Sequence, residues 1–152
     1  KSTSSPTLRR VIDDARPIAE AIGPHLVMGR SLGGAAAHEL YARPIASMLG
    51  VIFESTFSDV AGLIRRRGLV PPTLSPDERA TFDPLVKLPA GTLPILVLHG
   101  ERDHLIPLDY GRQFHADIAG SQLVVFDGLG HVPHEEDPAR TVAAIQPFLS
   151  LK

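Results

Sequence analysis

Short apolar runs alternate with amphipathic segments along this chain of 152 residues. Four of the runs, at residues 25–29, 51–53, 95–98 and 122–126, have the composition of strands buried on both faces. Apolar residues at helical spacing lie around them, at residues 6–22, 32–41, 58–67, 108–118 and 138–149. Strands that alternate with helices predict an α/β fold, with a parallel sheet of about four strands and helices on both of its faces.

Prolines and small residues set the expected boundaries of these elements. Ser5 is a candidate N-cap of the first helix and Gly23 ends it, while Pro17 is expected to kink or split it by removing one ladder hydrogen bond. Pro147 is expected to fray the last helix. Residues 68–91 contain five prolines and predict a Pro-rich connector made of loop and short turns.

Composition and charge exclude several classes of protein. Hydrophobic residues make up 43% and charged residues 21%, which is typical of a globular domain, and the net charge of −2 provides no general attraction for nucleic acid. The longest uncharged stretch, residues 88–100, is too short to span a bilayer. Because the chain has neither a transmembrane nor a signal segment, we expect a cytoplasmic protein. The absence of cysteine excludes disulfides, thiolate metal sites and a cysteine nucleophile.

A glycine-rich turn directly follows the first predicted strand. Its sequence, Gly29-Arg30-Ser31-Leu32-Gly33-Gly34, matches the pattern G-x-S-x-G in a strand-to-helix context. Small residues let the backbone turn tightly, so that the Ser31 hydroxyl stands at the start of a helix, where the Leu32 N–H can face a developing oxyanion. The alternative is an ordinary turn in which the serine only caps the helix.

A serine becomes a nucleophile only when a positioned base takes its proton. Asp103 follows the third predicted strand and His131 the fourth, so both leave the same edge of a parallel sheet as Ser31. Taken singly, a loop aspartate is usually a turn residue and a loop histidine a solvated one. The chain order Ser31, Asp103, His131 is, however, the order of an α/β-hydrolase triad.

These segments resemble the α/β-hydrolase family. The resemblance lies in the turn at residues 29–34, the acid segment His99-Gly-Glu-Arg-Asp-His-Leu-Ile-Pro107 and the base segment Gly128-Leu-Gly-His131, and it extends from about residue 25 to residue 149. Within the family, Met28-Gly-Arg-Ser-Leu-Gly33 and Phe53-Glu-Ser-Thr-Phe57 resemble lidless serine hydrolases related to the prolyl-oligopeptidase and serine-aminopeptidase groups.

The resemblance implies a role for each matching residue. Ser31 would be the nucleophile, Asp103 the acid that orients the imidazole, and His131 the general base and then the general acid. The Leu32 N–H would be one oxyanion donor. No cofactor and no metal is implied, and the histidines, at residues 25, 38, 99, 104, 115, 131 and 134, do not show a metal-ligand spacing.

One departure from the family pattern is large. The family has several more strands before the serine turn, one of which ends in a His-Gly loop that supplies a second oxyanion donor, whereas here a single helix precedes the first strand. We therefore expect one domain over residues 1–152 that is N-terminally incomplete, with a helix in residues 1–23 and the rest of the fold in residues 24–152. The first strand would be an uncovered sheet edge, which a missing N-terminal segment or a partner chain would complete. Loss of one oxyanion donor lowers a rate by roughly 10²- to 10³-fold, so we expect weak turnover from this chain alone.

Other polar residues are secondary candidates. Asp59, after the second strand, is an alternative triad acid, and His99 is expected to be buried at a strand end. Arg30 and the triplet at residues 65–67 favour a carboxylate or phosphate on the substrate, or else form a solvated face. Near His131 lie further residues that either tune its pKa, cap the last helix or are solvated: Asp127, His134, Glu135 and Glu136.

Two functions follow from this pattern. The first is a serine hydrolase that cleaves an ester, thioester or amide of a small molecule through an acyl-enzyme, with esterase preferred over peptidase. The second is a catalytically silent hydrolase-fold module that binds a small molecule or a protein across the open sheet edge. A hydrolase with an aspartate nucleophile is excluded, because position 31 is a serine.

Overall fold

A four-stranded parallel sheet forms the centre of the computed structural model, which describes residues 7–150. Its strands are β1 (His25–Arg30), β2 (Met48–Glu54), β3 (Ile95–Gly100) and β4 (Gln122–Phe126), and they lie side by side in chain order. All three neighbouring pairs are parallel. The predicted α/β fold is confirmed, and each predicted strand lies within the observed one.

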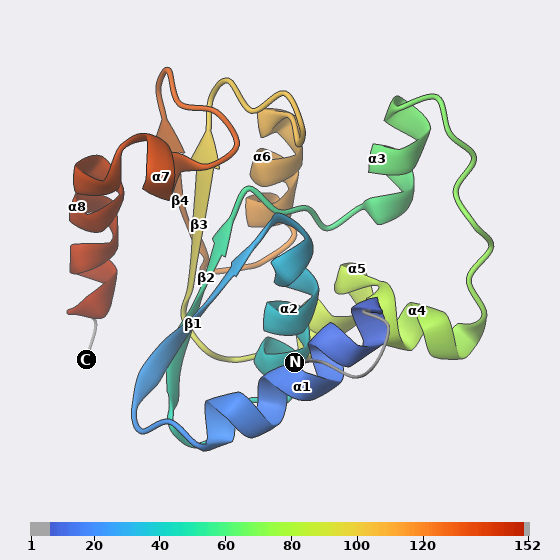
Figure 1. The fold of residues 1–152 in the computed structure, drawn as a ribbon, viewed down its shortest axis with the longest axis horizontal. Helices are drawn as coiled ribbons and strands as arrows, with labels where there is room; N and C mark the ends of the chain where they lie inside the picture. Colours follow the sequence, from blue (N-terminus) through green and yellow to red (C-terminus); the bar gives the residue numbers. More distant parts are fainter. Residues whose placement is uncertain (1–6, 151–152) are drawn as a thin grey trace.

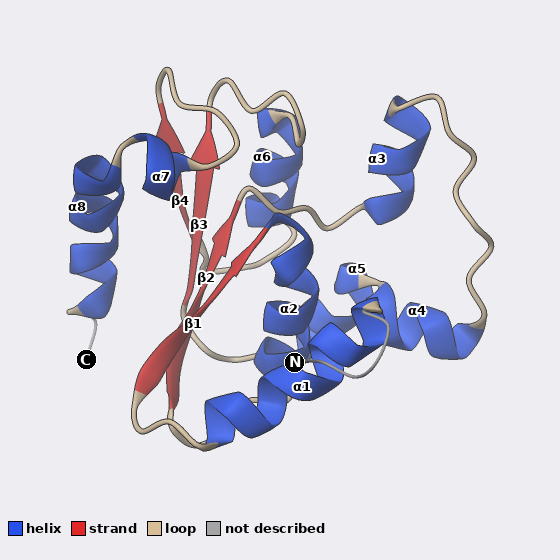
Figure 2. Ribbon diagram, viewed as in Figure 1, coloured by secondary structure: helices blue, strands red, loops and turns tan. Residues whose placement is uncertain are grey.

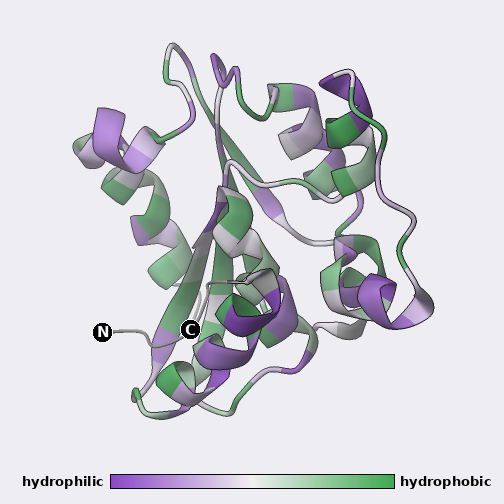
Figure 3. Cartoon of the chain, turned by 45° about the vertical axis from the view of Figure 1, so that its right-hand side comes forward, coloured by the Kyte–Doolittle hydropathy of each residue, from purple (hydrophilic) through white to green (hydrophobic). Residues whose placement is uncertain are grey.

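Helices cover both faces of this sheet (Figures 1 and 2). On one face lie α1 (Leu8–Glu20), α2 (Gly34–Ala42) and α6 (Leu108–Ala116), and on the other α7 (Pro133–Glu136) and α8 (Pro138–Leu149). Successive strand residues point to opposite faces, so Val51 and Phe53 pack beneath α2 and α6, whereas Ile52 packs with Phe148 of α8. Figure 3 shows the hydrophobic residues along the strands that build these two cores.

The predicted connector contains more helix than its prolines suggested. After α3 (Val60–Arg66) come α4 (Pro76–Phe82), α5 (Pro84–Lys87) and a 3-10 turn at Leu88–Ala90. Ser75 and Glu78 form a capping box at the start of α4, and the Asp83 carboxylate accepts from the Leu85 N–H at the start of α5. Pro76 and Pro84 occupy first-turn positions, where a missing N–H costs no hydrogen bond, so these prolines begin helices.

The first helix also differs from its prediction. Thr7 is its N-cap and accepts from the Arg10 N–H at 3.2 Å, whereas the predicted cap, Ser5, lies outside the described residues. Pro17 does not split α1, because it removes one ladder hydrogen bond while Ile12 and Ala19 stay buried against the core. At the other end of the chain, α8 continues past Pro147 to Leu149.

Within the described residues, β1 pairs only with β2 and forms one edge of the sheet. Met28 on this strand is 42% exposed, so an apolar side chain stands uncovered at the edge, as the sequence led us to expect. Between residues 7 and 150, none of the helices has the length and apolar character that a membrane crossing requires.

Candidate active site

Ser31 lies at a strained turn directly after β1. Its φ is 49°, in the left-handed region that side chains other than glycine rarely adopt, and a short 3-10 turn (Ser31–Gly33) leads into α2. A Cβ on Gly29 would lie 2.6 Å from the Ala37 Cβ, so only glycine lets α2 pack this closely on β1. Leu32 lies in the first turn, where N–H groups have no acceptor within the helix and face outward. The geometry is that of a nucleophile elbow.

The glycine that makes room for this turn is Gly34 and not Gly33. A Cβ on Gly33 would meet nothing within 4 Å, whereas one on Gly34 would collide with the Thr56 hydroxyl. That hydroxyl donates to the Ser31 carbonyl at 3.4 Å and so supports the turn from the neighbouring strand end. Ser55, beside Thr56, repeats the strained backbone with a φ of 48°. The elbow is therefore supported by the segment that follows β2.

Asp103 and His131 form a hydrogen-bonded pair at the carboxyl end of the sheet. His131 Nδ1 lies 2.8 Å from Asp103 Oδ2, and Asp103 Oδ1 accepts from the N–H groups of Leu105 at 2.9 Å and Ile106 at 2.8 Å. The Asp103 side chain is fully buried, so these three hydrogen bonds fix its position. Since an ionised carboxylate only accepts, Nδ1 carries the hydrogen and Nε2 of neutral His131 keeps its lone pair.

His99 supports the acid from the end of β3. It is fully buried, as predicted, and its Nε2 donates to the Ile106 carbonyl at 2.7 Å and lies 3.5 Å from Asp103 Oδ2. Burial lowers the pKa of His99, which keeps its ring neutral. A Cβ on Gly111 would collide with this ring, so α6 approaches closely enough to hold it.

Glu136 holds the backbone on both sides of His131. Its two carboxylate oxygens accept from the Gly130 N–H at 2.6 Å and the Val132 N–H at 3.0 Å. The hydrogen bonds to these two N–H groups lower the pKa of Glu136. Asp127, Glu135 and Glu136 are all exposed, as the solvated alternative expects, and Glu136 in addition accepts from these two N–H groups.

Ser31 shares the sheet edge with the Asp103–His131 pair but is not bonded to it. Arg30 and Glu54, the last residues of β1 and β2, are in register, whereas β3 runs two residues beyond Leu98, which pairs with Glu54. No hydrogen bond joins the Ser31 hydroxyl to His131 in the part of the chain that the structure describes. Such contacts are often long in the absence of substrate.

Residues 55–145 match the model of the Alpha/beta hydrolase family. The chain belongs to this family. Among curated proteins, the chain is similar to the uncharacterized protein Rv2715 of Mycobacterium tuberculosis, with 35% identity over 57 residues, which are 38% of this chain and 17% of that protein. The uncharacterized hydrolase YugF of Bacillus subtilis is 34% identical over 56 residues, 37% of this chain and 20% of YugF. The matched part thus spans about a fifth of these relatives.

Solved structures of low sequence identity share the fold of this chain. A hydrolase from Pseudomonas aeruginosa PA01 superposes with a TM-score of 0.73 at 21% identity, covering 97% of this chain and 75% of that one. A thermophilic esterase from Thermogutta terrifontis gives a TM-score of 0.68 at 22% identity, covering 96% and 73%. A serine hydrolase involved in carbazole degradation, CarC, gives 0.73 at 17% identity, covering 100% and 74%.

Within the described residues, His131 pairs with Asp103 and not with the alternative acid, Asp59. Asp59 is the N-cap of α3, where its carboxylate accepts from the Gly62 N–H at 2.7 Å and lies 3.9 Å from Arg65. Its interpretation as a triad acid is therefore wrong. Arg67, from the triplet expected on a solvated face, donates to the Leu105 carbonyl at 2.8 Å and ties α3 to the acid loop. Arg30, at the end of β1, is exposed.

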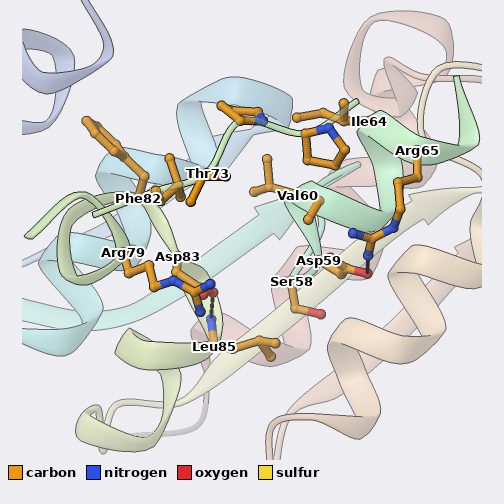
Figure 4. Close-up of a pocket in the computed structure, with 14 residues that line it drawn as sticks. Ser58, Asp59, Val60, Ile64, Arg65, Thr73, Arg79, Phe82, Asp83 and Leu85 are labelled. Atoms are coloured by element: carbon orange, nitrogen blue, oxygen red, sulfur yellow. Dashed lines mark hydrogen bonds and ion pairs between the residues drawn. The ribbon is translucent and has the colours of Figure 1, made fainter. Parts of the chain in front are cut away.

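A cavity of about 520 Å³ lies between α3 and the connector (Figure 4). Its walls are mostly apolar, with Ile64, Phe82 and Leu85 among them. Arg65 and Arg79 are charged residues of the lining. None of the three triad candidates lines this cavity. Over residues 7–150, no group of three or more histidine, aspartate or glutamate side chains is arranged to hold a metal ion.

Sequence reasoning overlooked one residue of this edge, Glu54. Its side chain is fully buried at the end of β2 and accepts from both the N–H and the ring of His134. The available signal was an acidic residue directly after the apolar run Val51-Ile-Phe53, because a charge inside a buried strand needs a partner. His134 was a secondary candidate, and this contact gives it a defined place.

Proposed function

We propose that the chain carries the reaction centre of a serine hydrolase that cleaves an ester, thioester or amide through an acyl-enzyme. The observation that supports this most strongly is the buried Asp103 carboxylate 2.8 Å from His131 Nδ1. The pairing leaves His131 Nε2 as a base on the sheet edge that also carries the strained Ser31. Similarity in fold to an esterase favours an ester over a peptide as substrate.

The reaction would proceed in two halves. Ser31 Oγ attacks the carbonyl carbon while its proton passes to His131 Nε2, and the Leu32 N–H donates to the resulting oxyanion. The tetrahedral intermediate collapses, the leaving group takes the proton from Nε2, and the acyl group stays on Ser31. Water then loses a proton to Nε2 and attacks the acyl carbonyl, which releases the acid and restores Ser31. Asp103 stabilises the imidazolium in both halves.

A second oxyanion donor and a neighbour for β1 would complete this centre. We propose that further chain supplies both, either as a preceding segment or as a partner chain. The open edge of β1, with Met28 exposed on it, supports this proposal. One donor is worth roughly 10²- to 10³-fold in rate.

A catalytically silent binding module is the competing function, and the missing hydrogen bond between Ser31 and His131 favours it. Intact mass after treatment with a fluorophosphonate at pH 8 separates the two, with Ser31→Ala as the control. A single adduct that disappears in Ser31→Ala is the result expected of the hydrolase. Folded protein that takes up no adduct would refute an assembled triad in this chain and leave the binding module.

A further inference from the structure

A second carboxylate–histidine pair lies at the sheet edge beside the proposed triad. His134 Nδ1 is 2.5 Å from Glu54 Oε2, and the His134 N–H donates to Glu54 Oε1 at 3.1 Å. Glu54 is fully buried, whereas the His134 side chain is 38% exposed. The pair joins residues 80 positions apart in the chain, so it fixes two elements that the backbone does not connect locally.

Burial makes Glu54 dependent on His134. A carboxylate that has lost its water must be hydrogen-bonded or paired, and both oxygens of Glu54 are occupied by His134. Within residues 7–150, no other group donates a hydrogen bond to Glu54. His134 depends less on this contact, because its Nε2 also lies 3.6 Å from the exposed carboxylate of Glu135. The contact therefore holds the His134 backbone at the end of β2.

The contact connects the surroundings of the two main residues of the proposed reaction centre, Ser31 and His131. Glu54 is in register with Arg30, the residue before Ser31, and β2 is the strand beside β1. His134 follows His131 by three residues and lies in the short helix α7. The side-chain hydrogen bonds to His131 and to its two flanking N–H groups come from Asp103, after β3, and from Glu136, at the end of α7. In the described chain, only the Glu54 contact links residues 128–137 to β2 by hydrogen bonds.

We infer that Glu54 and His134 form a clamp that positions His131 relative to Ser31. This inference rests on the proposed function. Both are positioning residues, because neither needs to touch the substrate: Glu54 fixes the first turn of α7, and α7 fixes the His131 loop. Loss of the clamp leaves the fold intact but lets the His131 loop move, so the His131–Asp103 hydrogen bond opens to water more often and the nucleophile is activated less often.

The test measures how fast a fluorophosphonate labels Ser31 as its concentration is raised, in four variants. His134→Leu removes the imidazole, and His134→Asn keeps a donor for Glu54. Glu54→Leu/His134→Leu replaces the pair with apolar side chains, which avoids leaving an unpaired buried charge that could prevent folding. His115→Leu is the matched control, because it also removes a histidine contact, with Ser121, but at the far end of α6.

The clamp predicts that the maximal labelling rate falls while the half-saturating concentration stays the same. We expect a loss of about 10- to 100-fold in His134→Leu and in the double variant, since small displacements of reacting groups have effects of this size. His134→Asn should recover most of the rate, and His115→Leu should match the wild type. A purely structural role would instead reduce the fraction of protein labelled and leave the rate of the folded fraction unchanged. Equal maximal rates in the wild type and the double variant would overturn the inference.

A second readout separates the failure of the clamp from the failure of the proposed function. The proton on His131 Nδ1, which is hydrogen-bonded to Asp103, is followed by NMR and requires no substrate. In His134→Leu and in the double variant, we expect this signal to broaden through faster exchange with water. A wild type that is never labelled at Ser31 refutes the proposed function, and the NMR signal then decides the clamp. An unchanged signal in both variants would overturn it.

Discussion

We expect His38 to make the stability of this protein depend on pH. It lies on α2, is 2% exposed, and stacks on Phe53 with ring centroids 4.6 Å apart, while Phe114 meets it edge-on at 5.4 Å. In the described part of the chain, neither ring nitrogen has a hydrogen-bond partner. Burial, aided by the positive charge of Lys87, lowers the pKa of His38 from 6.5 to about 3.

The sign of the effect follows from which state binds the proton. Below its ordinary pKa of 6.5, His38 is protonated in the unfolded chain but stays neutral in the folded one until the pH approaches 3. The unfolded state therefore binds more protons in this window, and the free energy of unfolding decreases as the pH falls. At pH 5 the loss relative to pH 7.5 is about 2 kcal/mol, because each unit below the unfolded pKa contributes about 1.4 kcal/mol.

Urea unfolding at pH 7.5 and pH 5.0 measures this effect in the wild type and in His38→Met. Methionine fills a similar volume and does not titrate, so the variant should lose about 2 kcal/mol less between the two pH values. His99, whose pKa is also lowered by burial, contributes in the same direction to both proteins and cancels in the comparison. His104→Met, at an exposed position, should keep the wild-type pH dependence. Equal pH dependence in the wild type and His38→Met would refute the reasoning.

Three further substitutions test the site and its support. Asp103→Asn should lower fluorophosphonate labelling by on the order of 10⁴-fold without unfolding, because the amide donates to His131 Nδ1 and moves the imidazole hydrogen to Nε2; labelling within tenfold of wild type would contradict this. Gly34→Ala should destabilise the protein and slow labelling, because the new Cβ would collide with the Thr56 hydroxyl. Gly33→Ala, where a Cβ meets no atom within 4 Å, should do neither, and equal effects of the two substitutions would count against this packing. Lys87→Met should cost about 2 kcal/mol in urea unfolding, because it removes the 2.7 Å charged hydrogen bond to Glu39 on α2 and leaves that carboxylate only Arg43, at 3.3 Å; an unchanged free energy of unfolding would argue against a stabilising pair.

The sheet and the acid–base pair were predictable because their signals are local. Each strand contains an uninterrupted apolar run, and a parallel sheet brings the carboxyl ends of such strands to one edge. Asp103 and His131 follow two of those ends directly, so their meeting required only that β3 and β4 be neighbours. The positions of Asp103 and His131 along the chain therefore predicted that their side chains meet at this edge of the sheet.

The helices of the connector were not predicted because proline has opposite effects at two positions of a helix. In a helix interior it breaks the hydrogen-bond ladder, but in the first turn its fixed φ favours the helix. Pro76 and Pro84 directly follow Ser75 and Asp83, whose side chains cap the two helices. A capping residue followed by proline was therefore the signal of a helix start, and the number of prolines alone does not reveal this signal.

The contact between Glu54 and His134 could not be predicted, because it depends on tertiary distance alone. As a result, three carboxylates hold the segment that contains His131. Asp103 accepts from the His131 ring, Glu136 accepts from the N–H groups on either side of His131, and Glu54 accepts from His134 at the start of α7. The backbone contributes as well, since the Arg102 N–H donates to the Leu129 carbonyl at 2.8 Å, but side chains supply the hydrogen bonds to the His131 ring and to its two flanking N–H groups. Two of these carboxylates stand at or just beyond the ends of buried strands. The position of the proposed base is therefore set chiefly by the rigid sheet, which is the requirement for a base that must return to the same place in both halves of the reaction.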